Sequence, residues 1–259
     1  MRRTVPWFGL FLLAASFVWF VLIPPEKEVA VKQPIHRPAF EEPFSIVVFD
    51  PGHGGQDSGA ICGNVLEKDL ALDVGRRAEQ LARAQGLQTV MTRSDDRYVS
   101  LGERAAIANR QRNCIFVSIH FNDVKRSAVS GVETYYALPA IAGAPVAWSG
   151  LPFGQQMLTE PPNAESQCLA SFIQDALVAH TQAVNRGTKP EQFYVLANVW
   201  HPAVLVEAGF ITNKFDVSKL GNEQYREQIA RAISEGIAAY REVVRHNQPT
   251  LALAMPRSE

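Results

Sequence analysis

Short apolar runs alternate with longer helical stretches along most of the chain. The apolar runs at residues 45–50, 87–92, 115–119, 132–137, 193–196 and 203–206 read as buried strands. Apolar periodicity and end signals predict helices over 67–85, 100–112, 164–184 and 222–246. Strands that alternate with helices predict an α/β domain with a covered, largely parallel sheet.

The ends of three predicted helices carry recognisable signals. Ser100 and Glu103 have the spacing of a capping box, in which two polar side chains satisfy backbone N–H groups at a helix start. Gly86 is suited to ending the helix that begins at Glu67, and Asn222 is suited to capping the last helix. These signals fix where the helices enter and leave the fold.

The first 25 residues read as a targeting segment. An apolar run over residues 5–23 follows Arg2 and Arg3, and about 19 helical residues span roughly 28 Å, close to the thickness of a hydrocarbon core. The arginines favour a cytoplasmic N-terminus, so the rest of the chain is expected to be exported. An uncleaved signal anchor that holds the protein at the membrane is favoured, and a cleaved signal peptide is the alternative. Residues 26–44 read as an extended tether. The domain that follows is therefore expected in the periplasm or at the cell surface.

Charge and cysteine content narrow the function. The 259 residues contain 25 Lys and Arg against 26 Asp and Glu, a net charge of −1, so no nucleic-acid partner is expected. Three cysteines are too few for a disulfide scaffold, and an odd number leaves at least one thiol unpaired. Cys114 is expected in the core, and the pairing of Cys62 with Cys168 stays open.

Candidate chemistry gathers where the predicted strands end. His53, His120 and Glu207 each follow an apolar strand, and Glu67 begins a helix after a glycine-rich loop. Because the carboxyl ends of parallel strands share one edge of a sheet, these side chains are expected to meet there. Two imidazoles and one carboxylate form a catalytic zinc set with an open position, so His53, Glu67 and His120 are candidate ligands of one Zn²⁺ ion. Glu207 is the candidate acid/base beside it.

Each of these residues also has an ordinary explanation. A single histidine after a strand is commonly a hydrogen-bonded core or loop residue, and Glu67 could simply favour its helix N-terminus. The glycines at 52–55 could cradle a phosphate, but the Lys-Ser/Thr ending of a P-loop is missing. Their coincidence at one sheet edge favours the metal site.

An ordered series of motifs resembles the catalytic domain of zinc-dependent N-acetylmuramoyl-L-alanine amidases of the cell-separation and sporulation type. The resemblance covers about residues 45–245. The motifs are Asp50-Pro-Gly-His53-Gly-Gly55, Leu66-Glu67-Lys-Asp69, Thr92-Arg93, Leu101-Gly-Glu-Arg104, Ser118-Ile-His120-Phe-Asn122, Gly131-Val-Glu-Thr-Tyr-Tyr136, Asn185-Arg-Gly187 and Val206-Glu207-Ala-Gly-Phe-Ile-Thr-Asn213.

The resemblance implies a single α/β domain, placed at residues 45–246, with a roughly six-stranded sheet. It implies a peptidoglycan hydrolase that cleaves the amide between N-acetylmuramic acid and the L-alanine of the stem peptide. By motif, His53, Glu67 and His120 match the zinc ligands and Glu207 the catalytic glutamate, while Asn122 is a candidate substrate-binding residue. The alternatives are a non-catalytic peptidoglycan-binding or scaffold protein, and another zinc hydrolase of wall fragments.

The chain departs from the usual pattern at residues 139–163, a connection far longer than most loops. In some relatives an insertion near here blocks the zinc site until a partner displaces it. We therefore expect either a lid on which a protein activator acts, with Glu160 or Glu165 approaching the metal, or a surface excursion. Residues 247–259 are expected to form a frayed tail.

Overall fold

The computed structural model describes residues 44–124, 128–137 and 164–246. The predicted membrane segment, almost all of the tether, the 139–163 connection and the tail lie outside the described residues. Within the described ranges, no helix has the length and apolar character needed to cross a membrane.

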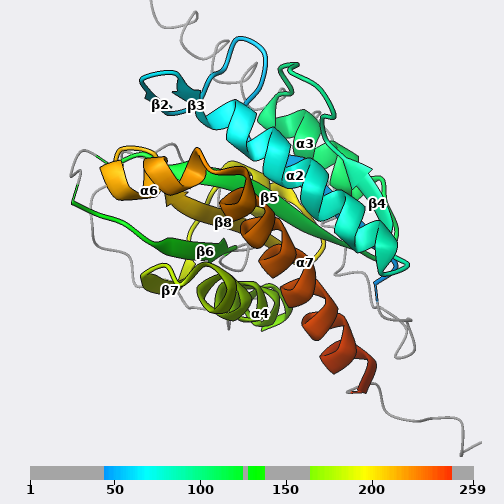
Figure 1. Cartoon of the computed structure of the whole chain (residues 1–259). Coiled ribbons are helices and arrows are strands. Elements are labelled where there is room, and N and C mark those ends of the chain that lie inside the picture. The colour runs from blue at the N-terminus through cyan, green and yellow to red at the C-terminus, as the bar shows by residue number, and fades with distance from the viewer. Residues whose placement is uncertain (1–43, 125–127, 138–163, 247–259) are drawn as a thin grey trace, which may run out of the picture. The chain divides into compact units, whose positions relative to one another are not determined.

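A six-stranded mixed sheet organises the domain (Figure 1), in the order β4-β1-β5-β8-β6-β7. Its strands are β1 (Ile46–Pro51), β4 (Gln88–Met91), β5 (Cys114–Asn122), β6 (Val132–Tyr136), β7 (Asn185–Pro190) and β8 (Ala203–Phe210). The first four in spatial order, β4, β1, β5 and β8, run parallel, and β6 pairs antiparallel to β8 while β7 follows β6 in parallel. The α/β class and the mostly parallel sheet are as predicted.

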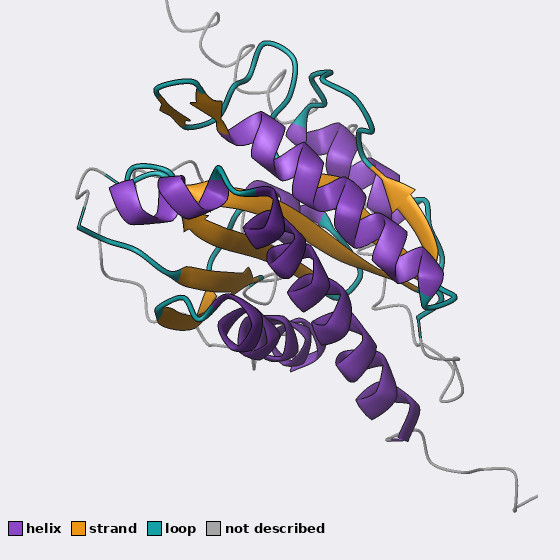
Figure 2. Ribbon diagram, in the orientation of Figure 1, coloured by secondary structure: helices purple, strands orange, loops and turns teal. Residues whose placement is uncertain are grey.

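Helices cover both faces of this sheet (Figure 2). One apolar cluster unites the sheet with α2 (Glu67–Ala84), α4 (Ala164–Thr181) and α7 (Glu223–His246). A smaller cluster on the other face includes residues of α3 (Leu101–Asn109) and α5 (Tyr194–Asn198). Alternate residues of each buried strand enter the two clusters, so neighbouring positions face opposite sides. The short helix α6 (Lys214–Leu220) lies between β8 and α7 in the chain.

The predicted helix signals act as caps. The Ser100 hydroxyl accepts a hydrogen bond from the Glu103 backbone N–H, and Asn222 Oδ1 accepts one from the Gln224 N–H. At the other end of α2, Gly86 adopts a positive φ of 80°, a conformation that favours glycine. Local sequence therefore determines the starts of α3 and α7 and the end of α2.

Two local predictions differ from the structure. Of residues 193–196, predicted as a strand, only Phe193 is extended. The short helix α5 begins at Tyr194, and Val195 and Leu196 within it pack into the smaller cluster. Strand β7 was not predicted because its sequence, Asn-Arg-Gly-Thr-Lys-Pro, is polar, as suits an edge strand. A small hairpin of β2 (Ile61–Cys62) and β3 (Val65–Leu66) was also not predicted.

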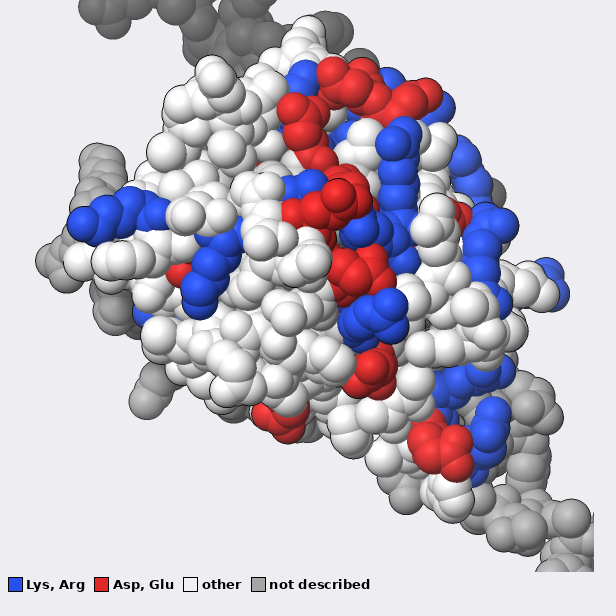
Figure 3. All heavy atoms as spheres, in the orientation of Figure 1, with Lys and Arg blue, Asp and Glu red and all other residues white. Residues whose placement is uncertain are grey.

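Charges join α2 to α7 on the outer surface. Arg77 of α2 pairs with Glu223 and Glu227 of α7, and Asp73 of α2 pairs with Arg226. Figure 3 shows acidic and basic side chains next to one another on this face of the molecule. The ion pairs align the two long helices that cover the larger cluster.

All three cysteines are free thiols, so Cys62 and Cys168 do not form a disulfide in this structure. Cys114 is buried on β5, as predicted for a core residue, and its Sγ contacts the Ala108 carbonyl oxygen.

Candidate metal centre

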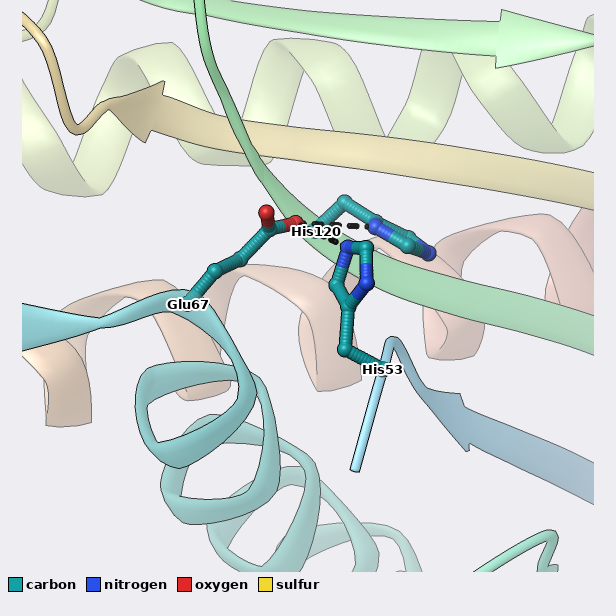
Figure 4. A group of neighbouring side chains, drawn as sticks. All are labelled: His53, Glu67 and His120. Atoms are coloured by element: carbon teal, nitrogen blue, oxygen red, sulfur yellow. Dashed lines mark hydrogen bonds and ion pairs between the residues drawn. The ribbon is translucent and has the colours of Figure 1, made fainter. Parts of the chain in front are cut away.

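Three side chains from distant parts of the chain converge at the carboxyl edge of the parallel strands (Figure 4). His53 lies in the loop after β1, Glu67 is the first residue of α2, and His120 lies near the end of β5. One potential ligand atom from each lies within 4.8 Å of the other two. Glu67 Oε1 is 3.0 Å from His53 Nε2 and 2.9 Å from His120 Nδ1. The group could hold one metal ion.

Asp57 orients the first imidazole. Its Oδ2 lies 2.8 Å from His53 Nδ1, while its Oδ1 accepts a hydrogen bond from the Gly59 N–H. The Nδ1 contact leaves Nε2 directed toward Glu67. Burial lowers the pKa of His53, but Glu67 and Asp57 outweigh it, so the pKa lies above its usual value. Sequence reasoning missed Asp57, although an acidic residue four positions after His53 was visible.

Glu67 is held as a carboxylate from both sides. Its Oε2 accepts from the Ala60 N–H at 2.8 Å, and its Oε1 accepts from the Phe121 N–H at 3.1 Å. Burial raises the pKa of Glu67, but the hydrogen bonds to the two imidazoles dominate and hold it far below its usual range. A buried anion of this kind is suited to a cation.

Two glycines allow the ligands to approach. A Cβ at Gly52 would lie 2.3 Å from the His120 ring, so any larger residue would displace that imidazole. Gly59 has a φ of +62°, and a Cβ there would lie 2.6 Å from both Glu67 and His53. The glycine-rich loop is therefore a close-fitting support for the three ligands.

Buried arginines fix the loop that carries His53. Arg104 donates to the Asp50 carboxylate and to the carbonyl oxygens of Pro51 and His53. Arg93 donates to the carbonyl oxygens of Pro51 and Gly52. Both arginines belong to motifs described above, but the sequence predicted no role for them. The structure shows that they hold the backbone around His53.

Glu207 stands beside this group. It is paired in register with His120 on the neighbouring strand, and both side chains line the same pocket. Its Oε2 is buried and has no hydrogen-bond partner among the described residues. Burial raises the pKa of Glu207 well above its usual range, and the nearby carboxylates of Glu67 and Glu133 raise it further. This carboxyl is poised to take up a proton.

Asn122 also lines the pocket and donates a hydrogen bond of 2.9 Å to Glu133, a residue that sequence reasoning missed. Glu165 is exposed in the first turn of α4 and is not among the residues that line this pocket. Glu160 lies outside the described residues, as does the rest of the predicted lid.

The pocket around these groups has a volume of about 450 Å³. Beyond the metal group it has an apolar side, where Tyr98 and Leu101 near the start of α3 and Tyr194 of α5 are about half exposed. The combination of a ligand group, a buried acid and a partly exposed apolar wall suits hydrolysis of a bound substrate.

Comparison with known proteins gives one family. The model of the Amidase_3 family, described as N-acetylmuramoyl-L-alanine amidase, matches residues 47–239. The sequence is 39% identical over 194 residues to the Bacillus subtilis protein YqiI, covering 75% of this chain and 84% of that protein. It is 38% identical over 194 residues to the B. subtilis N-acetylmuramoyl-L-alanine amidase LytC, covering 75% of this chain but 35% of LytC. A crystal structure of an N-acetylmuramoyl-L-alanine amidase from Clostridium difficile 630 superposes with a TM-score of 0.66 and 32% identity, covering 78% of this chain and 98% of that one.

Proposed function

The chain belongs to the N-acetylmuramoyl-L-alanine amidase family Amidase_3, and we propose that His53, Glu67 and His120 hold one Zn²⁺ ion while Glu207 is its acid/base. As a member of this family it is a peptidoglycan hydrolase that cleaves the amide between N-acetylmuramic acid and L-alanine, and such cell-wall amidases act outside the cytoplasm. The observation that carries the site assignment is the convergence of three ligand atoms within 4.8 Å of one another.

The donor chemistry fits zinc. Catalytic zinc sites commonly combine histidine nitrogens with one carboxylate and leave a position open, whereas Ca²⁺ and Mg²⁺ prefer oxygen ligands alone. The contact between His53 and Asp57 resembles the outer hydrogen bond that orients zinc-bound histidines. The close fit of Gly52 and Gly59 around the ligands supports a site built for this geometry.

The chemistry requires activated water and a proton carrier. Zinc, when bound, supplies a Lewis acid that polarises an amide carbonyl and makes water more acidic. Glu207 accepts the proton of the attacking water and donates it to the departing alanine nitrogen, which is otherwise a poor leaving group. Its raised pKa supports this role, because a carboxyl that binds protons more tightly than usual is better able to carry one between two groups. Asn122 is proposed to contact the substrate beside it.

Metal content of single variants tests the ligand assignment. We expect His120→Ala to purify with little zinc, because only His53 and Glu67 remain. The matched control is His180→Ala, which removes an imidazole of α4 that is paired with Glu235 of α7 and should keep its zinc. Zinc is measured by plasma mass spectrometry after dialysis. Equal zinc in wild type and His120→Ala would refute the assignment.

Mass spectrometry of digested peptidoglycan identifies the bond that is cut. The amidase releases peptides with a new alanine N-terminus. Free acetate would instead indicate a deacetylase, and no product would indicate a binding or scaffold protein.

The proposed location is a membrane-anchored one, based on the apolar residues 5–23 that follow Arg2 and Arg3. Residues 1–25 would be the signal anchor and residues 26–44 the tether to the catalytic domain at 45–246. Sequencing the N-terminus of the mature exported protein tests this. A mature chain that begins after residue 25 would replace the anchor by a cleaved signal peptide.

Regulation through residues 139–163 is also proposed from sequence alone, with a protein activator acting on that segment. A chain that lacks residues 141–162 should then have higher activity than the full chain when no activator is present. Equal activity of the two chains, with and without candidate activators, would dispose of the regulatory role.

A further inference from the structure

A bulge in β7 places two cations on one face of the sheet. Opposite β6, the register shifts between Val132, paired with Asn185, and Thr134, paired with Thr188, so β7 has one extra residue. In a regular strand, positions 186 and 189 would face opposite sides. The extra residue brings both side chains to Glu133, which Arg186 and Lys189 each contact.

Glu133 is more than neutralised by its partners. It is 2% exposed, and its Oε2 accepts from Arg186 Nε at 2.9 Å and from Lys189 Nζ. Its Oε1 accepts from Asn122 at 2.9 Å and from the Tyr135 hydroxyl at 2.6 Å. One buried anion thus faces two cations, an excess of one positive charge.

The excess charge reaches solvent. The side chains of Arg186 and Lys189 are 32% and 39% exposed. Within the residues that the structure describes, the two terminal nitrogens of the Arg186 guanidinium have no hydrogen-bond partner, although the group lies over the Phe210 ring. Glu133 therefore orients a pair of cations whose outer donors remain available to an anion.

This pair adjoins the pocket by two routes. Asn122 lines the pocket and contacts Glu133 directly. Phe193, also in the pocket wall, packs against Tyr135, whose ring lies 5.7 Å from Lys189 Nζ. Across the sheet, β7 lies two strands from β8, which carries Glu207, or about 10 Å at the usual strand spacing.

We propose that Arg186 and Lys189 bind a carboxylate of the stem peptide, on the residue that follows alanine. The proposal rests on the amidase function. The lactyl carboxyl of the sugar is consumed in the scissile amide, so the substrate's anionic groups are peptide carboxylates. An extended peptide advances about 3.5 Å per residue, so a carboxylate on the second residue lies roughly 7–10 Å from the scissile nitrogen. That distance is close to the backbone spacing of about 10 Å between β8, which carries Glu207, and β7, which carries the two cations.

Two soluble muropeptides that differ at one group test the site. In one, the second peptide residue carries a free carboxylate, and in the other the same group is a carboxamide. We expect the wild-type protein to favour the carboxylate by about 10- to 100-fold in kcat/KM, the range for a charge-assisted contact. Lys189→Gln should reduce this ratio to within a few-fold of one. The ratio is unaffected by the folded fraction of a preparation.

Arg231→Gln is the matched control, because it removes an exposed positive charge from α7, on the other face of the sheet, and should keep the wild-type ratio. Calorimetry of the free peptide and its carboxamide with the metal-free protein should show the same preference. Cleavage of both muropeptides at equal efficiency by wild type would overturn the carboxylate site while leaving the amidase function intact. An unchanged ratio in Lys189→Gln would also overturn it. Cleavage of neither muropeptide by wild type would count against the proposed function itself, and with it this proposal.

Discussion

The two faces of the sheet share the same strands but bury different chemistry. The face under α2, α4 and α7 is filled by apolar residues such as Val206, Leu177 and Ile233. On the other face the same strands carry Asp50 and Glu207, close to the arginine and carboxylate partners described above. Neighbouring residues Val206 and Glu207 thus belong to different environments.

The contrast shows how the domain combines stability with a costly site. Burying a charge or an unpaired carboxyl is unfavourable, whereas burying apolar surface is the main stabilising contribution to folding. The larger apolar face offsets the cost of the polar face. Substitutions on the first face should therefore change stability, and substitutions on the second should change chemistry.

The largest expected effect is that of Glu207→Gln, which tests the chemical role of the polar face. We expect kcat to fall by about 10²–10⁴-fold, because the amide cannot carry the proton. Zinc content should be retained, and thermal stability should be equal or higher, because the neutral amide cannot take the charge that burial and the carboxylates of Glu67 and Glu133 disfavour. Turnover and melting temperature are measured on the same sample. Amidase activity near wild type would remove Glu207 from its role.

Ile233→Ala tests the apolar face. Ile233 is fully buried on α7, and its truncation should lower the free energy of unfolding by about 2–5 kcal/mol. Activity per folded molecule should stay unchanged under native conditions. Urea titration and steady-state kinetics check the two statements. A large loss of kcat at full folding would show that the two faces are coupled.

Asp57→Asn tests, within the polar face, whether the orientation of His53 matters for metal binding. Loss of the charge that orients His53 should weaken zinc binding by about 10- to 100-fold with little change in stability. Competition with a chelator gives the affinity. Asp175→Asn, on the exposed side of α4, is the matched control and should bind zinc as wild type does. Equal affinity of the two variants would contradict the orienting role.

The smallest expected effect concerns pH. Burial raises the pKa of Glu133, but the hydrogen bonds from Lys189, Tyr135 and Arg186 outweigh it and lower the pKa below its usual value. Such a group stabilises the fold above its unfolded pKa of about 4.3, and that stability is lost as the pH falls through the folded pKa. We expect Glu133→Gln to lose less unfolding free energy than wild type between pH 6 and pH 3, as measured by urea titration. Parallel pH profiles would contradict this linkage.

Much of the fold could be predicted because apolar runs and caps are local signals. The ends of β1 and β5 and the start of α2 followed from them, and these ends position His53, His120 and Glu67. The reversal of β6 could not be predicted, since strand direction depends on pairing across the sheet. Strand β7 was missed because polar residues such as Asn185 and Lys189 satisfy an edge strand without an apolar pattern.

The partners of the site were missed for a related reason. Glu133 lies in a strand of mostly buried residues, and a buried acid there requires cations. These come from β7, more than 50 residues away in the sequence. Asp57 lies four residues after His53, but their contact depends on a loop conformation with a positive φ at His53 and a backbone bridge between Gly54 and Asp57, which the sequence does not specify.

The antiparallel direction of β6 determines where the 139–163 connection joins the sheet. Tyr136, the last residue of β6, is paired with Val204 near the beginning of β8, and the Ser166 hydroxyl at the start of α4 accepts a hydrogen bond from the Ala203 N–H. Both attachment points of the 139–163 connection therefore lie at the sheet edge remote from the metal ligands. The length of that connection can therefore change without displacing the ends of β1 and β5, which position His53 and His120.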